Sequence, residues 1–109
     1  MKQDIEKFTA LLHELQKIDP EFPLQYAICF FEIALNEGLC LTDLSEKTGM
    51  PLSTISRITS ALTQERARGK AYGLIQVKIP PDERRKKQLF LTQKGYNTAS
   101  RISNIMSKQ

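Results

Sequence analysis

Residues 41–64, LTDLSEKTGMPLSTISRITSALTQ, contain two short helical patterns separated by Gly49. Thr42 is of a residue type that caps helix N-termini, and Asp43 favours the positive end of a helix. Gly49 supplies a left-handed stop, because glycine adopts positive φ without steric cost. A second helix is expected after Pro51. The stretch therefore predicts two helices joined by a tight turn.

The second of these helices is expected to have two unlike faces. Ile55, Ile58 and Leu62 recur at helical spacing and predict a buried side. The other side carries short hydroxyl groups, an arginine and a glutamine. The predicted contact set on this helix is Leu52, Ser53, Thr54, Ser56, Arg57, Ser60 and Gln64.

A β-hairpin is expected next along the chain. Residues 74–79 alternate, with Ile75, Val77 and Ile79 predicted on the apolar face. The sequence PPDERR at 80–85 indicates a turn, since two prolines cannot continue a strand ladder. Residues 86–91 are expected to form the return strand.

Three further helices complete the prediction. Residues 4–18 are amphipathic, residues 24–35 are apolar nearly all round and predict a central buried helix ended by Gly38, and a last helix begins at Thr92. A chain of 109 residues is long enough for one domain with one core. The fold class expected is mainly α with a small β-hairpin, an α+β winged helix-turn-helix.

Charge is unevenly distributed along the chain. Residues 1–50 contain four Lys and Arg against nine Asp and Glu, whereas residues 51–109 contain twelve against three. Such asymmetry is expected of a protein that neutralises phosphates on one face, although an unevenly charged solvated surface is the alternative.

The few potentially reactive side chains predict no enzyme. Cys29 and Cys40 form no CxxC pair and lie in apolar runs, where they are expected to pack as small hydrophobic residues. His13 is the only histidine. We therefore expect no catalytic site, metal or cofactor. Because the apolar runs are short and no signal peptide is recognisable, we expect an intracellular, cytoplasmic protein without a membrane partner.

These features together predict a unit, residues 41–92, that reads double-stranded DNA. A helix fits the major groove, where Arg57 could contact a guanine edge or a phosphate. A basic hairpin tip could lie on the backbone or in the minor groove. The predicted contacts of the hairpin are Asp82, Glu83, Arg84, Arg85, Lys86 and Lys87, and the further basic contacts are Arg66, Arg68 and Lys70. Plain solvent exposure is the alternative for each cluster.

The runs LTDLSEKTGMPLSTISRITSALT, GLIQV and PPDERRKKQLFLTQKGY resemble the winged helix of the multiple antibiotic resistance regulator (MarR) family, over about residues 23–96. The resemblance implies that Glu83, or its neighbour Asp82, orients the wing, and that Arg85 enters the minor groove. It carries helix contacts over to Ser53, Thr54 and Arg57.

The sequence departs from the family pattern in four places. Glu83 stands where an aspartate is usual, and Pro51 stands where a capping side chain is usual. Several extra residues lie between Leu62 and Gly73, which could alter how the wing docks. The chain also ends at Gln109, before the family's full carboxy-terminal helical pair.

The terminal segments, residues 1–22 and 93–109, predict a homodimer. Both carry apolar stripes outside the reading unit, although packing on the protein's own core is the alternative. The predicted dimerisation residues are Ile5, Phe8, Leu12, Leu15, Tyr96, Ile102 and Met106. A two-fold dimer would present two reading helices to half-sites about 34 Å apart.

The function expected is a sequence-specific transcriptional regulator, a repressor bound to a pseudo-palindromic operator as a dimer, and a small-molecule effector is compatible with it. The alternative is a winged-helix adaptor that binds proteins through the terminal stripes without specific DNA binding.

Overall fold

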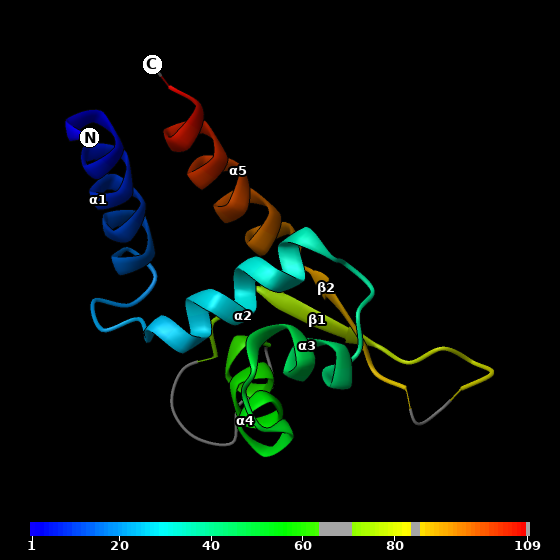
Figure 1. Ribbon diagram of the computed structural model, residues 1–109. Helices are drawn as coiled ribbons and strands as arrows, with labels where there is room; N and C mark the ends of the chain where they lie inside the picture. The colour runs from blue at the N-terminus through cyan, green and yellow to red at the C-terminus, as the bar shows by residue number, and fades with distance from the viewer. Residues whose placement is uncertain (64–70, 84–85, 109) are drawn as a thin grey trace.

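The computed structural model describes residues 1–63, 71–83 and 86–108. Within these residues the order of elements is helices, hairpin, helix, as predicted for an α+β chain (Figure 1). The elements are α1 (Lys2–Gln16), α2 (Leu24–Leu35), α3 (Leu41–Thr48), α4 (Leu52–Leu62), β1 (Ile75–Lys78), β2 (Gln88–Leu91) and α5 (Gln93–Ser107).

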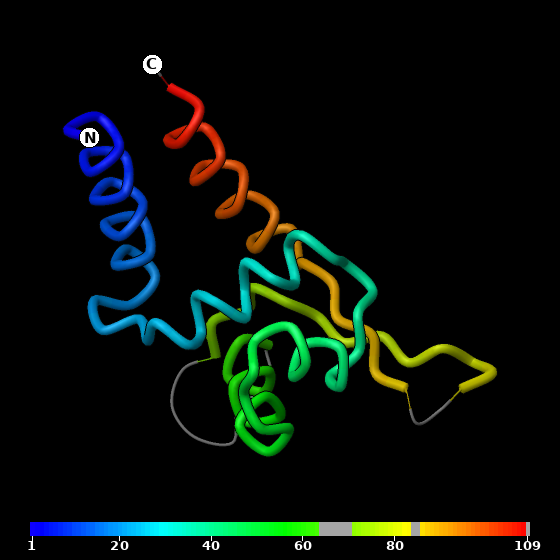
Figure 2. The backbone as a smooth tube through the Cα atoms, in the orientation of Figure 1, coloured from blue at the N-terminus to red at the C-terminus, as the bar shows by residue number. Residues whose placement is uncertain are grey.

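Helices α1 and α5 lie side by side and antiparallel, and they project from the rest of the molecule. Both chain termini therefore lie at one end, far from the hairpin tip (Figure 2). Leu15 of α1 and Ile102 of α5 pack with Ala27 of α2 in a small buried cluster. At the far end of the pair, Lys7 Nζ donates to the Met106 carbonyl oxygen at 3.1 Å.

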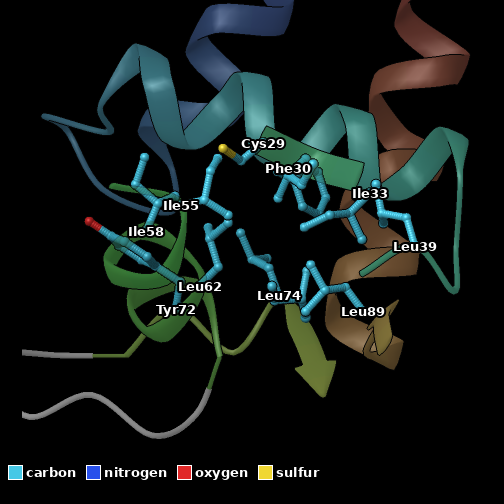
Figure 3. Packing of buried hydrophobic residues seen from close by; sticks show 12 residues of the cluster. Cys29, Phe30, Ile33, Leu39, Ile55, Ile58, Leu62, Tyr72, Leu74 and Leu89 are labelled. Atoms are coloured by element: carbon cyan, nitrogen blue, oxygen red, sulfur yellow. The ribbon is translucent and has the colours of Figure 1, made fainter. Parts of the chain in front are cut away.

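The larger core lies between α2, α3, α4 and the hairpin (Figure 3). Ile55, Ile58 and Leu62 of α4 are at most 2% exposed, which confirms the predicted inward face. Their neighbours in the cluster come from every surrounding element: Cys29, Phe30, Ile33, Leu39, Leu44, Tyr72, Leu74, Ile75 and Leu89. Helix α4 is thus held by its apolar side, and its polar side faces away from the core.

Helix α2 begins at Leu24, as expected, but two details of its prediction are wrong. Its C-cap is Asn36 and not Gly38, although Gly38 does adopt a positive φ of 97° in the loop that follows. Leu24 and Leu35 are 72% and 76% exposed, so the helix is buried on one side only. Apolar composition all round does not bury a helix where no neighbouring element covers it.

Helix α3 begins earlier than predicted. Its N-cap is Cys40, not Thr42, and the Asp43 carboxylate accepts a hydrogen bond of 3.1 Å from the Cys40 backbone N–H. This contact is the reciprocal half of a capping box, which serves the start of the helix without a Ser or Thr cap. At the other end Gly49 adopts φ 75°, as predicted.

Strands β1 and β2 pair antiparallel, with Ile75 opposite Leu91 and Lys78 opposite Gln88. Only Ile75 of the predicted apolar face reaches the core, because the hairpin extends past the helices (Figure 1). Val77 and Ile79 are 37% and 53% exposed. The outer edge of β2 is covered by the loop before α3, since Gly38 N donates to Leu89 O and Leu89 N donates to Leu39 O.

The stripes predicted for dimerisation divide into two groups. Leu15 and Ile102 are buried inside the protein's own α1–α5 pair. The other members are exposed: Ile5, Phe8, Leu12, Tyr96 and Met106.

Candidate nucleic-acid interface

The outer face of α4 is polar and open to solvent. Ser53, Ser56, Arg57 and Ser60 are exposed, Leu52 is exposed at the first turn, and Thr54 is half-buried. No side-chain hydrogen bond caps α4, whose N-cap is Pro51, as its sequence predicts. Gln64 lies outside the described residues.

The turn between α3 and α4 is fixed by side-chain hydrogen bonds. Ser45 Oγ donates to the Met50 carbonyl oxygen at 2.6 Å. The Thr48 hydroxyl donates to Leu44 O at 2.8 Å and accepts from Met50 N at 3.2 Å. Because both partners of Met50 lie on α3, the angle at which α4 leaves the turn is set by α3.

Two backbone hydrogen bonds are described at the hairpin tip. Glu83 N donates to Pro80 O at 3.2 Å, and Lys86 N donates to Glu83 O at 3.0 Å. Asp82, Glu83, Lys86 and Lys87 are all exposed there. Five predicted contacts lie outside the described residues: Arg66, Arg68, Lys70, Arg84 and Arg85.

Two hollows are lined by side chains from both α4 and the hairpin. The first, of about 750 Å³, lies between the starts of α3 and α4 and the hairpin, and Leu52, Glu83 and Lys86 contribute to its wall. The second, of about 530 Å³, lies between α4 and β1 and is lined by Ser56 and Ser60. Lys87 lines both hollows. The two hollows therefore join Leu52, Ser56 and Ser60 of α4 to Glu83, Lys86 and Lys87 of the hairpin, whereas Ser53, Thr54, Arg57 and Asp82 line neither of them.

Asp43 adds a negative charge near the first hollow. The hydrogen bond from the Cys40 backbone N–H lowers the pKa of this carboxyl, and Lys86 and Lys47 contribute attraction. Asp43 thus stays ionised at neutral pH while it is engaged at the start of α3. Asp43 lies in the first turn of α3, where a negative charge interacts favourably with the positive end of the helix dipole.

Among the polar side chains that sequence reasoning did not include, some line the second hollow and one lies on the neighbouring strand. Thr59 and Gln76 line the second hollow, and the buried Thr59 hydroxyl has no hydrogen-bond partner among the described residues. Lys78 lies over the Phe90 ring with its Nζ 4.8 Å from the ring centroid. The alternating pattern of β1 predicts Lys78 on the outward face of the strand, and this signal could have added Lys78 to the predicted contacts of the hairpin.

Among the residues that the structure describes, no helix has the length and apolar character of a membrane span. Residues 1–63, 71–83 and 86–108 contain no group of three or more His, Cys, Asp or Glu side chains arranged to hold a metal ion.

Comparison with known proteins agrees with this geometry. Residues 34–67, which include α3, the turn and α4, match the model of the IclR helix-turn-helix domain. A MepR variant from S. aureus bound to an oligodeoxyribonucleotide superposes with a TM-score of 0.73 at 17% identity, over 92% of this chain and 67% of that one. The chain has a MarR-like winged helix-turn-helix fold.

Two further MarR-type structures are similar. MarR itself gives a TM-score of 0.66 at 20% identity, over 85% of this chain and 61% of that one. The transcriptional repressor CouR bound to a 23-mer DNA duplex gives 0.67 at 22% identity, over 95% of this chain and 67% of that one. The winged-helix chain thus spans about two thirds of the length of these proteins. No curated protein sequence gives a significant match to it.

In this fold α4 is the second helix of the helix-turn-helix and the β1–β2 hairpin is the wing. The prediction of an α+β winged helix-turn-helix is confirmed. The roles of the individual helix and wing residues stay predictions.

Proposed function

We propose that this protein is a DNA-binding transcriptional regulator. The observation that carries the proposal is the shared surface of α4 and the wing, where Ser56 and Ser60 face the same hollow as Lys87. A polar helix face beside a basic hairpin suits a DNA duplex, since base edges are read in the major groove while phosphates accept basic side chains.

Within this surface Arg57 is the proposed base-reading side chain. It is exposed on the outer face of α4, and its guanidinium can donate two parallel hydrogen bonds to the O6 and N7 atoms of guanine. The short side chains of Ser53 and Ser56 allow the helix to approach the base edges closely. Lys86 and Lys87 are proposed phosphate contacts, which position the protein without reading sequence.

We further propose that residues 1–109 form one domain and that this domain acts as a homodimer. The protein would be cytoplasmic and would repress transcription. The exposed apolar side chains of the α1–α5 pair, with Phe8 and Tyr96 as the largest, would form the two-fold contact. A two-fold protein binds a pseudo-palindromic operator, because each reading helix meets an equivalent half-site. Occupying that operator would block transcription.

The comparisons support this proposal. The MepR variant and CouR were solved bound to DNA, and CouR is described as a transcriptional repressor. Each of these two structures superposes on this chain over more than nine tenths of its length.

In vitro selection of bound duplexes from a random pool, followed by sequencing, tests the proposal. We expect an enriched inverted repeat, bound with an affinity that falls by about 0.9 log units per log unit of salt for each phosphate contacted. A pool without enrichment at moderate salt contradicts sequence-specific binding. Retention of a protein partner from nuclease-treated lysate, together with an unenriched pool, would favour the adaptor function instead.

A further inference from the structure

The three residues Tyr72–Leu74 lie between the end of the reading helix and the start of α5. Their backbone N–H groups all donate to the last carbonyls of α4 or its cap. Tyr72 N bonds Ala61 O at 3.2 Å, Gly73 N bonds Thr63 O at 3.3 Å, and Leu74 N bonds Leu62 O at 2.9 Å. These carbonyls would otherwise lack a partner within the helix. The end of α4 is therefore closed by this segment.

The carbonyl groups of the same three residues all face α5. Lys94 Nζ donates to Tyr72 O at 2.8 Å and Thr92 Oγ1 donates to Gly73 O at 2.6 Å. Thr92 N donates to Leu74 O at 3.1 Å. The backbone polar groups of the segment therefore bind two different helices. The N–H groups donate to α4 or its cap, and the carbonyl groups accept from α5 or its cap.

Close packing fixes the α5 side further. A Cβ atom added at Gly95 would lie 1.9 Å from the Leu74 carbonyl oxygen, which is far inside van der Waals contact. The backbone of α5 therefore rests directly on the segment, with no side chain between them.

The Tyr72 side chain extends the connection to a third element. Its hydroxyl donates to Asp19 Oδ2 at 2.6 Å, in the loop between α1 and α2. Its ring packs against Phe22 and Tyr26 at centroid distances of 5.1 and 6.1 Å. Figure 3 shows the hydroxyl at the edge of the core cluster, pointing away from Leu62.

We propose that Tyr72–Leu74 is a positioning element that fixes the reading helix relative to the α1–α5 pair, and that it thereby determines the half-site spacing the dimer accepts. The inference rests on the proposed function, in which the α1–α5 pair forms the dimer contact. A rigid connection makes spacing selective, because one inserted base pair rotates one half-site by about 35° around the duplex axis. A loosened connection lets the reading helices follow that rotation.

The experiment measures binding to the selected operator and to variants with one or two base pairs added to or removed from its centre. Wild-type protein, Tyr72→Phe and the control Tyr26→Phe are compared, with a single half-site as reference. Both substitutions remove a hydroxyl from the same aromatic cluster, but only Tyr72 bonds Asp19. We expect Tyr72→Phe to keep its half-site affinity and to reduce the penalty for one inserted base pair by about threefold to tenfold, the equivalent of one net hydrogen bond. Tyr26→Phe should keep the wild-type penalty.

A second variant, Lys94→Met, tests the α5 side of the segment if Tyr72→Phe is poorly folded, with Lys108→Met as its charge-matched control. Spacing profiles of Tyr72→Phe and Lys94→Met that parallel the wild-type profile would overturn the inference while leaving DNA binding intact. Wild-type protein that prefers no duplex would overturn the proposed function, and the inference with it.

Discussion

Arg101 Nε lies 2.7 Å from Glu14 Oε1, and this ion pair joins α5 to α1 across 87 residues of sequence. Lys17 Nζ contacts the other carboxylate oxygen of Glu14 at 2.9 Å. Glu14 is buried, whereas both basic side chains are largely exposed. The acid is therefore the member of the cluster that depends most on its partners.

Replacing Glu14 with Gln should lower the free energy of unfolding by about 1–2 kcal/mol, because a charge-assisted contact to Arg101 is lost while a polar group stays buried. Urea unfolding at pH 7 measures the change. Glu6→Gln, at an exposed position of α1, is the matched control and should leave stability within about 0.5 kcal/mol of wild type. Equal losses in the two variants would contradict a structural role for the pair.

The Glu14–Arg101 pair should also make the free energy of unfolding depend on pH. Hydrogen bonds from Lys17 and then Arg101 hold the pKa of Glu14 below its ordinary value of 4.5. A depressed pKa means that the stabilisation is present above the pKa of the unfolded chain and is lost as pH falls through the folded value. The stability difference between wild type and Glu14→Gln should therefore be constant near neutrality and shrink below about pH 4. A difference that persists undiminished at pH 2.5 would exclude this linkage.

Gly95→Ala should destabilise the protein, although the same change at an open helix position stabilises by up to about 1 kcal/mol. The added methyl group would meet the Leu74 carbonyl oxygen at 1.9 Å, so α5 would have to move off the segment before β1. We expect a loss of at least about 2 kcal/mol in thermal or urea unfolding. Ser103→Ala, at an exposed position of α5, serves as control. An unchanged midpoint for Gly95→Ala would show that the helix does not rest on Leu74.

The two cysteines should differ sharply in reactivity. Burial, with a smaller effect of the Glu32 charge, raises the pKa of the Cys29 thiol to about 11, whereas Cys40 is half-exposed. Since the thiolate is the nucleophile, iodoacetamide at pH 8 should label Cys40 first and leave Cys29 unmodified until the protein is unfolded. Mass spectrometry of peptides with and without guanidinium reads this out. Equal labelling of both residues in folded protein would contradict the burial of α2.

Substitutions on the proposed interface should separate base reading from phosphate contact. Arg57→Ala should weaken operator binding by about 1–3 kcal/mol and relax sequence preference. Lys87→Ala should weaken binding to all duplexes and reduce the salt slope by about 0.9. Lys108→Ala removes a positive charge at the far end of α5 and controls for net charge. Salt-dependent titrations that do not distinguish Arg57→Ala from Lys108→Ala would contradict the proposed orientation of α4.

Much of the fold was predictable because its signals are local. The periodicity of α4, the glycine stop at Gly49 and the Thr92 cap each lie within one or two turns of the element they define. The predicted start of α5 is confirmed, because Thr92 is its N-cap and Thr92 Oγ1 accepts from Gly95 N at 3.0 Å. The start of α3 was misplaced because Cys40 is not a residue type that usually caps helices, and Asp43 supplies the reciprocal bond.

The features that sequence reasoning could not find depend on distant neighbours. Periodicity marks Leu15 and Ile102 as members of apolar stripes, but it cannot tell whether such a stripe packs within the chain or against a second copy. The exposure of Val77 follows from how far the hairpin extends beyond the helices. The contact between Tyr72 and Asp19 joins residues 53 positions apart, and neither residue type signals the other.

Because the backbone groups of Tyr72–Leu74 are held by α4 and α5, the register of the wing should not depend on the number of residues that follow Thr63. Strand β1 begins directly after Leu74, whose backbone N–H donates to α4 and whose carbonyl oxygen accepts from the N-cap of α5. The backbone contacts that fix the start of β1 therefore come after Ala71, so a change in the number of residues between Thr63 and Ala71 should leave the register of the wing unchanged.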